Sequence, residues 1–115
     1  MSQPIVFFDI AGPDSEALRA FYAAAFDWDC TQSTSFQPGN SQAIGAHIRQ
    51  DPKEMVLYIG VPDINAALEK IETLGGKIDV PRYEVSGVAV LALFLDPAGN
   101  RLGLVEMNGD APIIP

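Results

Sequence analysis

The sequence predicts an α+β fold built from two βαβββ modules, whose curved mixed sheets enclose a cleft. Three observations carry this prediction. Apolar runs typical of strands alternate with apolar stripes typical of helices along the chain. A shift of 49 positions lays the start of the chain over its second half, and the same strand, proline, helix cap and helix recur in order. The length of 115 residues suits one compact domain but not two.

The first expected element is a mostly buried strand over Ile5 to Ile10, bounded by Pro4 and by Gly12-Pro13. Asp14 is placed to cap the helix that follows, because a carboxylate there can accept a backbone N–H of the first turn. Apolar residues then recur at helical spacing, which predicts ordinary core positions above all for Phe21, Tyr22 and Phe26. The full stripe is Leu18, Phe21, Tyr22, Ala25 and Phe26.

The rest of the first module, which covers about residues 4–50, has a weaker pattern. Trp28 to Phe36 and Ala43 to Arg49 resemble strands that flank the turn-rich Gln37 to Ser41. The second module, about residues 53–107, starts with a strand over Met55 to Val61.

The helix of the second module is expected to begin after Asp63 and to end at Gly75-Gly76, where a left-handed backbone favours glycine. Its predicted buried stripe is Ile64, Ala67, Leu68, Ile71 and Leu74.

Three strands complete the second module. They are expected over Lys77 to Val85, over Val88 to Leu95 and over Leu102 to Met107, with turns at Ser86-Gly87 and at Asp96 to Asn100. The middle strand is apolar throughout, which predicts a central strand covered on both faces. The tail, residues 108–115, has no periodic pattern, although its two isoleucines could cover an apolar groove.

The charge of −8 argues against nucleic acid or an anionic membrane surface as partner, because both would be repelled. A small neutral or cationic ligand is easier to accommodate. The single cysteine, Cys30, fits a reducing cytosol, and the N-terminus lacks the basic region of a signal peptide. No apolar run reaches the roughly 18 residues of a membrane span, so we expect a cytoplasmic protein.

Three segments carry a family resemblance: FYAAAFDW (residues 21–28), VPDINAALEKIETLGG (61–76) and DPAGNRLGLVE (96–106). In this order, around an internal duplication, they resemble the short glyoxalase-like branch of the glyoxalase / bleomycin-resistance / extradiol-dioxygenase (vicinal oxygen chelate) superfamily. The resemblance covers roughly residues 4–107. It implies a single domain, a homodimer, and kinship with lyases such as lactoylglutathione lyase, with isomerases and with dioxygenases.

The resemblance also implies a divalent metal, held in the cleft by His and Glu side chains from the first and last strands of each module. The corresponding positions here are Phe7 and Val56 on the first strands and Gly45 and Gly103 on the last strands. None of them can ligate through its side chain. No metal cofactor is therefore expected, and zinc, nickel, manganese or iron enters only if another ligand set replaces the usual one.

Strand alternation predicts what remains near the cleft. If Phe7 and Val56 point into it, so do Asp9 and Tyr58, while Phe8, Ile10, Leu57 and Ile59 face the helices. The same parity brings in His47 and Val105, and Trp28, just after the first helix, is expected at the mouth. The predicted ligand-binding residues are Phe7, Val56, Tyr58, Trp28 and Val105, and the predicted catalytic residues are His47 and Asp9.

Each of these polar groups also has a structural interpretation. His47, the single histidine, is either a general acid or base oriented by Asp9 or a partly exposed strand residue without a role. Asp9 has either a function or a structural hydrogen bond to Tyr58. Tyr58 either donates its hydroxyl to a ligand or closes a core. Glu106 lies three residues past the ligand position, on the opposite face, which argues against a ligand role.

Three classes of function follow. The first is a metal-free protein that binds an aromatic or amphiphilic small organic molecule in its cleft. The second is a lyase, isomerase or dioxygenase relative that uses an atypical ligand set around His47, Asp9 and Glu106, or metal-free proton transfer by Asp9 and His47. The third is a protein-interaction domain whose cleft is filled by its own tail, Ile113-Ile114.

Overall fold

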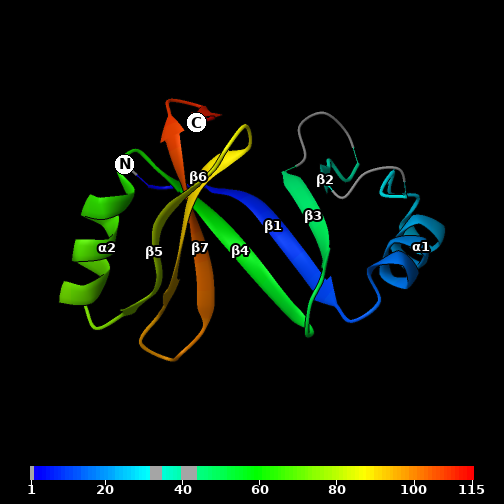
Figure 1. The fold of residues 1–115 in the computed structure, drawn as a ribbon, viewed down its shortest axis with the longest axis horizontal. Coiled ribbons are helices and arrows are strands. Elements are labelled where there is room, and N and C mark those ends of the chain that lie inside the picture. Colours follow the sequence, from blue (N-terminus) through cyan, green and yellow to red (C-terminus); the bar gives the residue numbers. More distant parts are fainter. Residues whose placement is uncertain (1, 32–34, 40–43) are drawn as a thin grey trace. The chain divides into compact units, whose positions relative to one another are not determined.

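The computed structural model describes residues 2–31, 35–39 and 44–115. The chain forms two compact units, one of residues 7–57 and one of residues 1–6 with 58–115. Each unit packs one helix against a mixed sheet, as Figure 1 shows for α1 and α2. The α+β class predicted from the sequence is confirmed, and so is the order of strand, helix and strands in each half of the chain.

The unit of residues 7–57 contains a short mixed sheet. β1 (Ile5–Gly12) runs parallel to β3 (Gly45–Gln50), and β2 (Ser35–Phe36) is antiparallel to β3. The helix α1 (Ser15–Phe26) begins after Asp14, whose carboxylate accepts the Ala17 N–H at 3.0 Å, as expected of an N-cap. The buried centre of this unit is Ile10, Cys30 and Ile48.

The predicted core stripe of α1 is wrong in part. No residue of α1 is buried, and Phe21 and Phe26 are 58% and 60% exposed. The helix packs through Leu18, Tyr22 and Ala23, a narrower stripe than predicted. The reason is the small sheet beneath it, in which β2 has two residues and cannot cover the flanks of the helix.

The strand predicted over residues 28–36 is also wrong in part, because residues 27–30 form no regular structure and β2 spans only Ser35–Phe36. Residues 32–34 and 40–43, which belong to this predicted strand, the turn and the start of the next strand, lie outside the described residues.

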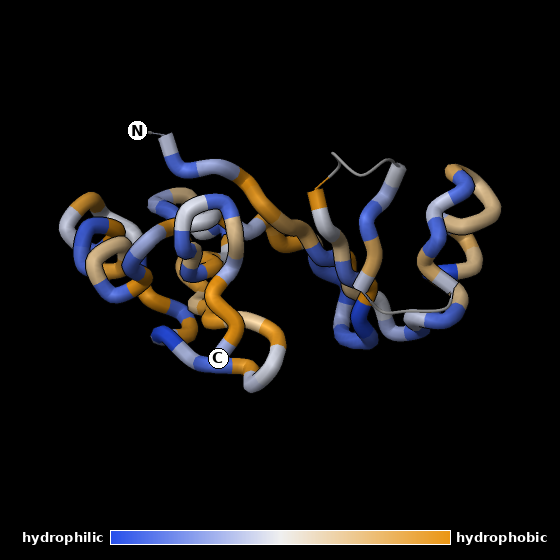
Figure 2. The backbone as a smooth tube through the Cα atoms, turned by 90° about the horizontal axis from the view of Figure 1, so that it is seen from above, coloured by the Kyte–Doolittle hydropathy of each residue, from blue (hydrophilic) through white to orange (hydrophobic). Residues whose placement is uncertain are grey.

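The second unit has four main strands in the order β4-β7-β6-β5. β4 runs parallel to β7, and the other neighbours are antiparallel. The predicted strands agree with the structure to within one residue at each end. Figure 2 shows hydrophobic segments, in orange, in the interior of this unit. Its elements are the part of β4 (Glu54–Val61) from residue 58 on, α2 (Ile64–Thr73), β5 (Lys77–Val85), β6 (Ala89–Leu95), β7 (Arg101–Asn108) and β8 (Ala111–Pro112).

The helix α2 starts and ends as predicted. Asp63 caps it by accepting the Ala66 N–H at 3.1 Å, and Gly75 follows with a φ of 98°. Ile64 and Leu68 are buried against the sheet, as expected. Leu74 is not part of the stripe, because it is the C-cap residue and is exposed.

The C-terminal tail covers the same core. Ile113 packs against the cluster that joins α2 to the sheet, and its N–H donates to the carbonyl oxygen of Glu106 at 2.9 Å. Ile114 is exposed. Ile113 therefore packs on the α2 side of its sheet, in the core of its own unit. Among the described residues, no helix is both long and apolar enough to span a membrane.

Candidate functional site

One face of β1 and β3 carries the polar residues that the sequence singled out. Ile10, Ile48 and Phe8 pack toward α1, so the residues that alternate with them face away from the helix, as predicted. Along this face Phe7 lies opposite Gly45, and Asp9 lies opposite His47. We call it the Asp9 face, and it consists of Phe7, Asp9, Gly45, His47 and Arg49.

An aromatic ring lies over a glycine in each unit. A Cβ atom added to Gly45 would come within 3.0 Å of Phe7 Cδ1. In the other unit, Tyr58 is the strand partner of Gly103, and a Cβ atom on Gly103 would overlap carbons of the Tyr58 ring. The two positions where the superfamily places last-strand metal ligands are thus covered by aromatic carbon.

These residues do not fit the metal that the fold family implies. Phe7, Gly45, Val56 and Gly103 offer no donor atom, and the space beside both glycines is taken by rings. Among the described residues, no group of three or more His, Cys, Asp or Glu side chains could hold a metal ion.

Arg49 is the residue that sequence reasoning missed. Its Nε lies 3.2 Å from Asp9 Oδ2, its Nη1 2.8 Å from Asp51 Oδ2, and its Nη2 2.7 Å from Glu54 Oε1. The ion pair with Arg49 gives the buried Asp9 carboxylate a charged partner, and its hydrogen bond to Tyr58 stays a prediction. The signal was present in the sequence, because Arg49 follows His47 by two residues and so shares its face.

His47 is held in its neutral form. Burial of the imidazole lowers its pKa below the ordinary value of 6.5, the charge of Asp9 opposes this, and the positive charges of Arg49 and Arg19 add to it. A neutral imidazole at pH 7 can accept a proton or a hydrogen bond. His47 is partly exposed, so a small molecule can reach its imidazole ring.

The charges around His47 can be measured directly, because a chain with one histidine gives one imidazole Hε1 signal in a proton NMR titration. We expect a His47 pKa below 6.5 in the unaltered protein. Asp9→Asn should lower it further, and Arg49→Gln should raise it, since each removes one of the opposing charges. A His47 pKa that stays the same in both variants would contradict this arrangement of charges.

The predicted ligand-binding residues do not all offer surface to a ligand. Val56, Tyr58 and Val105 are 1%, 8% and 6% exposed, so they support the structure more than they present a binding surface. Trp28 is not at a cleft mouth. It packs with Phe8 on the α1 side of β1, where its ring stacks on Tyr22 at a centroid distance of 5.0 Å.

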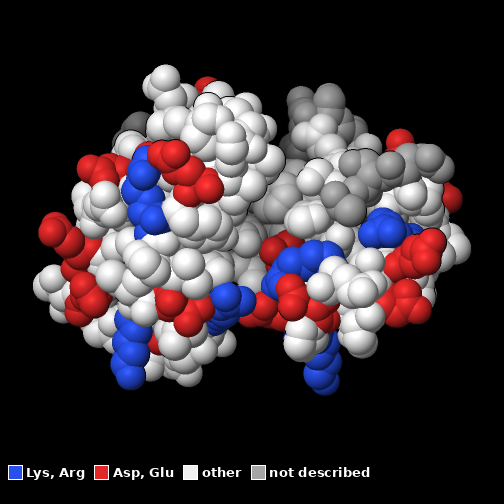
Figure 3. All heavy atoms as spheres, in the orientation of Figure 1, with Lys and Arg blue, Asp and Glu red and all other residues white. Residues whose placement is uncertain are grey.

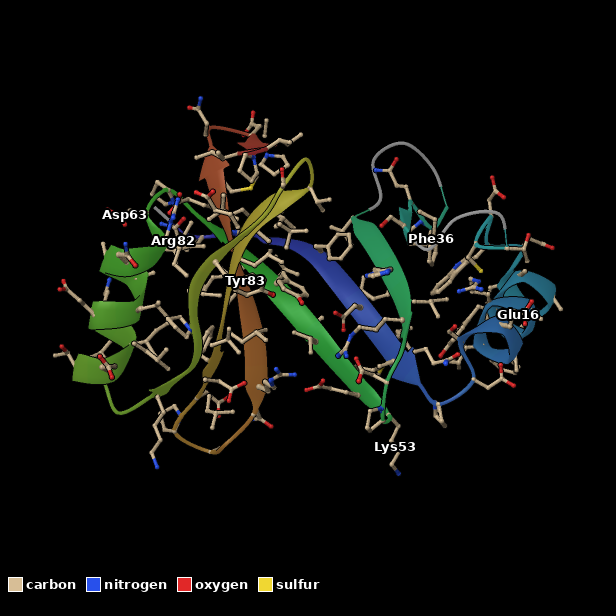
Figure 4. The ribbon with its side chains drawn as sticks, in the orientation of Figure 1. Glu16, Phe36, Lys53, Asp63, Arg82 and Tyr83 are labelled. Carbon is tan, nitrogen blue, oxygen red and sulfur yellow. The ribbon has the colours of Figure 1, made fainter. Side chains whose placement is uncertain are left out.

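Glu106 has a structural task in the second unit. Its Oε2 accepts the N–H of Ile64, the first residue of α2, at 2.9 Å, and its Oε1 pairs with Arg82 at 3.0 Å. Figure 4 labels Arg82 on β5 and Asp63, the N-cap residue of α2. These bonds lower the pKa of Glu106, the Arg82 hydrogen bond most. As predicted, Glu106 faces away from the side of β7 that Tyr58 covers.

Comparison with known proteins gives a consistent picture. A family model described as a glyoxalase-like domain matches residues 5–105. The chain is 24% identical to a putative glyoxylase, CFP32, of Mycobacterium tuberculosis and 26% identical to the anthracycline biosynthesis protein DnrV of Streptomyces peucetius, with 87% of the chain covered in each case. It spans only 44% and 47% of the lengths of these two proteins.

A solved structure shares the fold. A variant of the Streptomyces coelicolor methylmalonyl-CoA epimerase, in complex with 2-nitronate-propionyl-CoA, superposes with a TM-score of 0.64 over 95% of this chain and 97% of its own. The sequence identity is 14%, so the likeness concerns the fold alone.

Proposed function

The chain belongs to the glyoxalase-like domain family, and from this premise we propose that it binds a small ring-containing organic molecule on the Asp9 face without the family's metal. The observation that carries the proposal is on the Asp9 face, where the partly exposed Phe7 ring lies over Gly45, a position that the family resemblance assigns to a metal ligand. A surface of aromatic carbon with a few polar groups suits an organic ligand better than an ion.

The exposed groups of the face support this class of ligand. Phe7 is partly exposed and offers a ring on which a planar molecule can stack. His47 lies about 7 Å further along the neighbouring strand, since it follows the Phe7 partner Gly45 by two residues, and can form a hydrogen bond to a polar substituent. A molecule of one or two rings therefore reaches both groups.

Binding of 2-naphthol tests the proposal, because the compound has two fused rings and one hydroxyl. Isothermal titration calorimetry should detect binding to the unaltered protein. His47→Ala and Phe7→Ala should each weaken it by about 1 kcal/mol, roughly a fivefold rise in Kd, as one hydrogen bond or one stacking contact is lost. Lys70→Ala, on the exposed side of α2, is the matched control and should leave Kd unchanged.

The metal-free part of the proposal has its own measurement. Elemental analysis of protein purified without a histidine tag should find no stoichiometric zinc, nickel, manganese or iron. A bound metal, or 2-naphthol binding that is equally strong in His47→Ala, Phe7→Ala and the control, would remove the Asp9 face from consideration.

A second candidate function is metal-free proton transfer, as in an isomerase or lyase. The observation that favours it is the position of Asp9 directly opposite a neutral His47, since a neutral imidazole beside a carboxylate can take up a proton. Deuterium uptake at the α-carbon of hydroxyacetone in D2O, followed by NMR, should then depend on His47 and disappear in His47→Ala. If deuterium uptake stays at the uncatalysed rate, the proton-transfer candidate is contradicted and ligand binding remains the proposed function.

A further inference from the structure

We propose that Arg49 and its carboxylates set the charge specificity of the Asp9 face, so that it accepts neutral and cationic ring compounds and rejects anionic ones. This inference rests on the proposed function, because it concerns the ligand class of the same site. An arginine on a binding face ordinarily recognises a carboxylate or a phosphate through paired N–H donors. Here the surroundings of Arg49 prevent that use.

All three guanidinium nitrogens of Arg49 are already bound to carboxylates. Nε faces Asp9 on β1, while Nη1 and Nη2 face Asp51 and Glu54, which come from the turn after β3 and from the start of β4. Each pair lies within 3.2 Å, and the Arg49 side chain is only 22% exposed. An incoming anion would therefore meet three carboxylates around the guanidinium before it could form a bidentate contact.

The charge of the group is negative. Three carboxylates surround one guanidinium, which leaves two negative charges in excess when His47 is neutral. These charges lie on or beside the face that carries Phe7 and His47. The whole chain adds to the effect, with 15 acidic and 7 basic residues, and Figure 3 shows red side chains spread over the visible surface. An anionic ligand is repelled at short range and at long range.

The network also keeps Asp9 in place. Asp9 is 3% exposed, and burial of a carboxylate is costly unless a cationic partner lies beside it. Because Asp51 and Glu54 hold the far side of the same guanidinium, Arg49 cannot turn toward a ligand without breaking two ion pairs. Arg49 thus determines specificity because the three carboxylates hold its guanidinium away from the ligand.

Three naphthalene probes of different charge test the inference: neutral 2-naphthol, cationic 2-naphthylmethylamine and anionic 2-naphthoate. They share one ring system, so stacking on Phe7 is matched and charge is the variable. We expect the unaltered protein to bind the neutral and the cationic probe roughly tenfold or more tightly than 2-naphthoate at low salt. The difference should shrink in 1 M NaCl, where the Debye length falls to about 3 Å.

The double variant Asp51→Asn/Glu54→Gln removes both excess charges and leaves Asp9 and Arg49 in place. It should bring 2-naphthoate to within about threefold of 2-naphthol, because the positive charge of Arg49 is then offset by Asp9 alone. The single variant Asp51→Asn, at a side chain 53% exposed, should fold without difficulty and give part of the effect. Glu84→Gln is the matched control, since Glu84 has similar exposure and pairs with Arg82 instead.

The outcomes separate the inference from the proposal beneath it. If 2-naphthol binds but 2-naphthoate binds as tightly, or if the double variant leaves the ratio as it was, the charge specificity is overturned and the proposed function stands. If none of the three probes binds, the proposed function fails and the inference fails with it. A change of the ratio in Glu84→Gln equal to that in Asp51→Asn would assign the effect to net charge and overturn the role of Arg49.

Discussion

Gly103→Glu is expected to destabilise the protein by at least about 3 kcal/mol and to create no metal site. The substitution supplies the side chain that the superfamily uses for its metal, but Gly103 is buried and the Tyr58 ring occupies the position of the new Cβ. The Tyr58 Cγ atom alone would lie 3.0 Å from it. A buried carboxylate without a partner adds a further cost. Urea or thermal unfolding measures the change.

Two comparisons show whether the Tyr58 ring causes the expected loss of stability. Gly103→Ala should also cost about 3 kcal/mol, whereas Gly45→Ala should cost about 1 kcal/mol, because only the edge of the partly exposed Phe7 ring must shift. In a Tyr58→Ala background, Gly103→Ala should cost little, which a double-mutant cycle would reveal as a large coupling energy. If the costs at Gly103 and Gly45 are equal, or the coupling is near zero, then the ring-over-glycine arrangement does not hold.

Glu106→Ala is expected to lower the free energy of unfolding by about 3 kcal/mol, roughly a 10 °C fall in Tm for a chain of this size. The change leaves the Ile64 N–H at the start of α2 without its acceptor and removes the carboxylate partner of Arg82. Glu106→Gln keeps an acceptor for Ile64 and should cost about half as much. Equal stability of all three proteins would contradict the structural task of Glu106.

The loss should depend on pH. The folded-state pKa of Glu106 lies below its ordinary value of 4.5, so the folded protein binds the proton less well than the unfolded chain does. The stabilisation is therefore complete above pH 4.5 and is lost as the pH falls through the folded-state pKa. The stability difference between the unaltered protein and Glu106→Gln, measured by urea unfolding, should be constant near pH 7 and should shrink below pH 4.5. A difference that grows on acidification would contradict this.

Much of the fold could be predicted because local signals and the internal repeat agreed. Asp14 and Asp63 cap helices as expected, and Gly75 ends the second helix with a positive φ. The superfamily resemblance is confirmed at the level of the family by the match over residues 5–105. Where signals were sparse, prediction failed: Phe21 and Phe26 have helical spacing, but no sheet wide enough lies beneath them.

The candidate site was predictable only to the level of strand alternation. The period of two placed Phe7, Asp9 and His47 on one face, because that period depends on backbone geometry alone. It could not indicate that Arg49 pairs with Asp9, since an ion pair between strands depends on register, and register is set by the tertiary fold. Trp28 was misplaced for the same reason, as a residue after a helix end can turn to either side of the sheet.

The parallel pairing of β1 with β3 and of β4 with β7 has a kinetic consequence. Each pair joins the first strand of a module to a strand near the end of that module. The contacts of Phe7 with Gly45 and of Tyr58 with Gly103 therefore form only after the intervening chain has closed a long loop. Such non-local contacts raise the contact order, and their loop-closure entropy must be offset before they stabilise anything. We therefore expect the rings to settle on their glycines late in folding, only after the last strand of each module has docked.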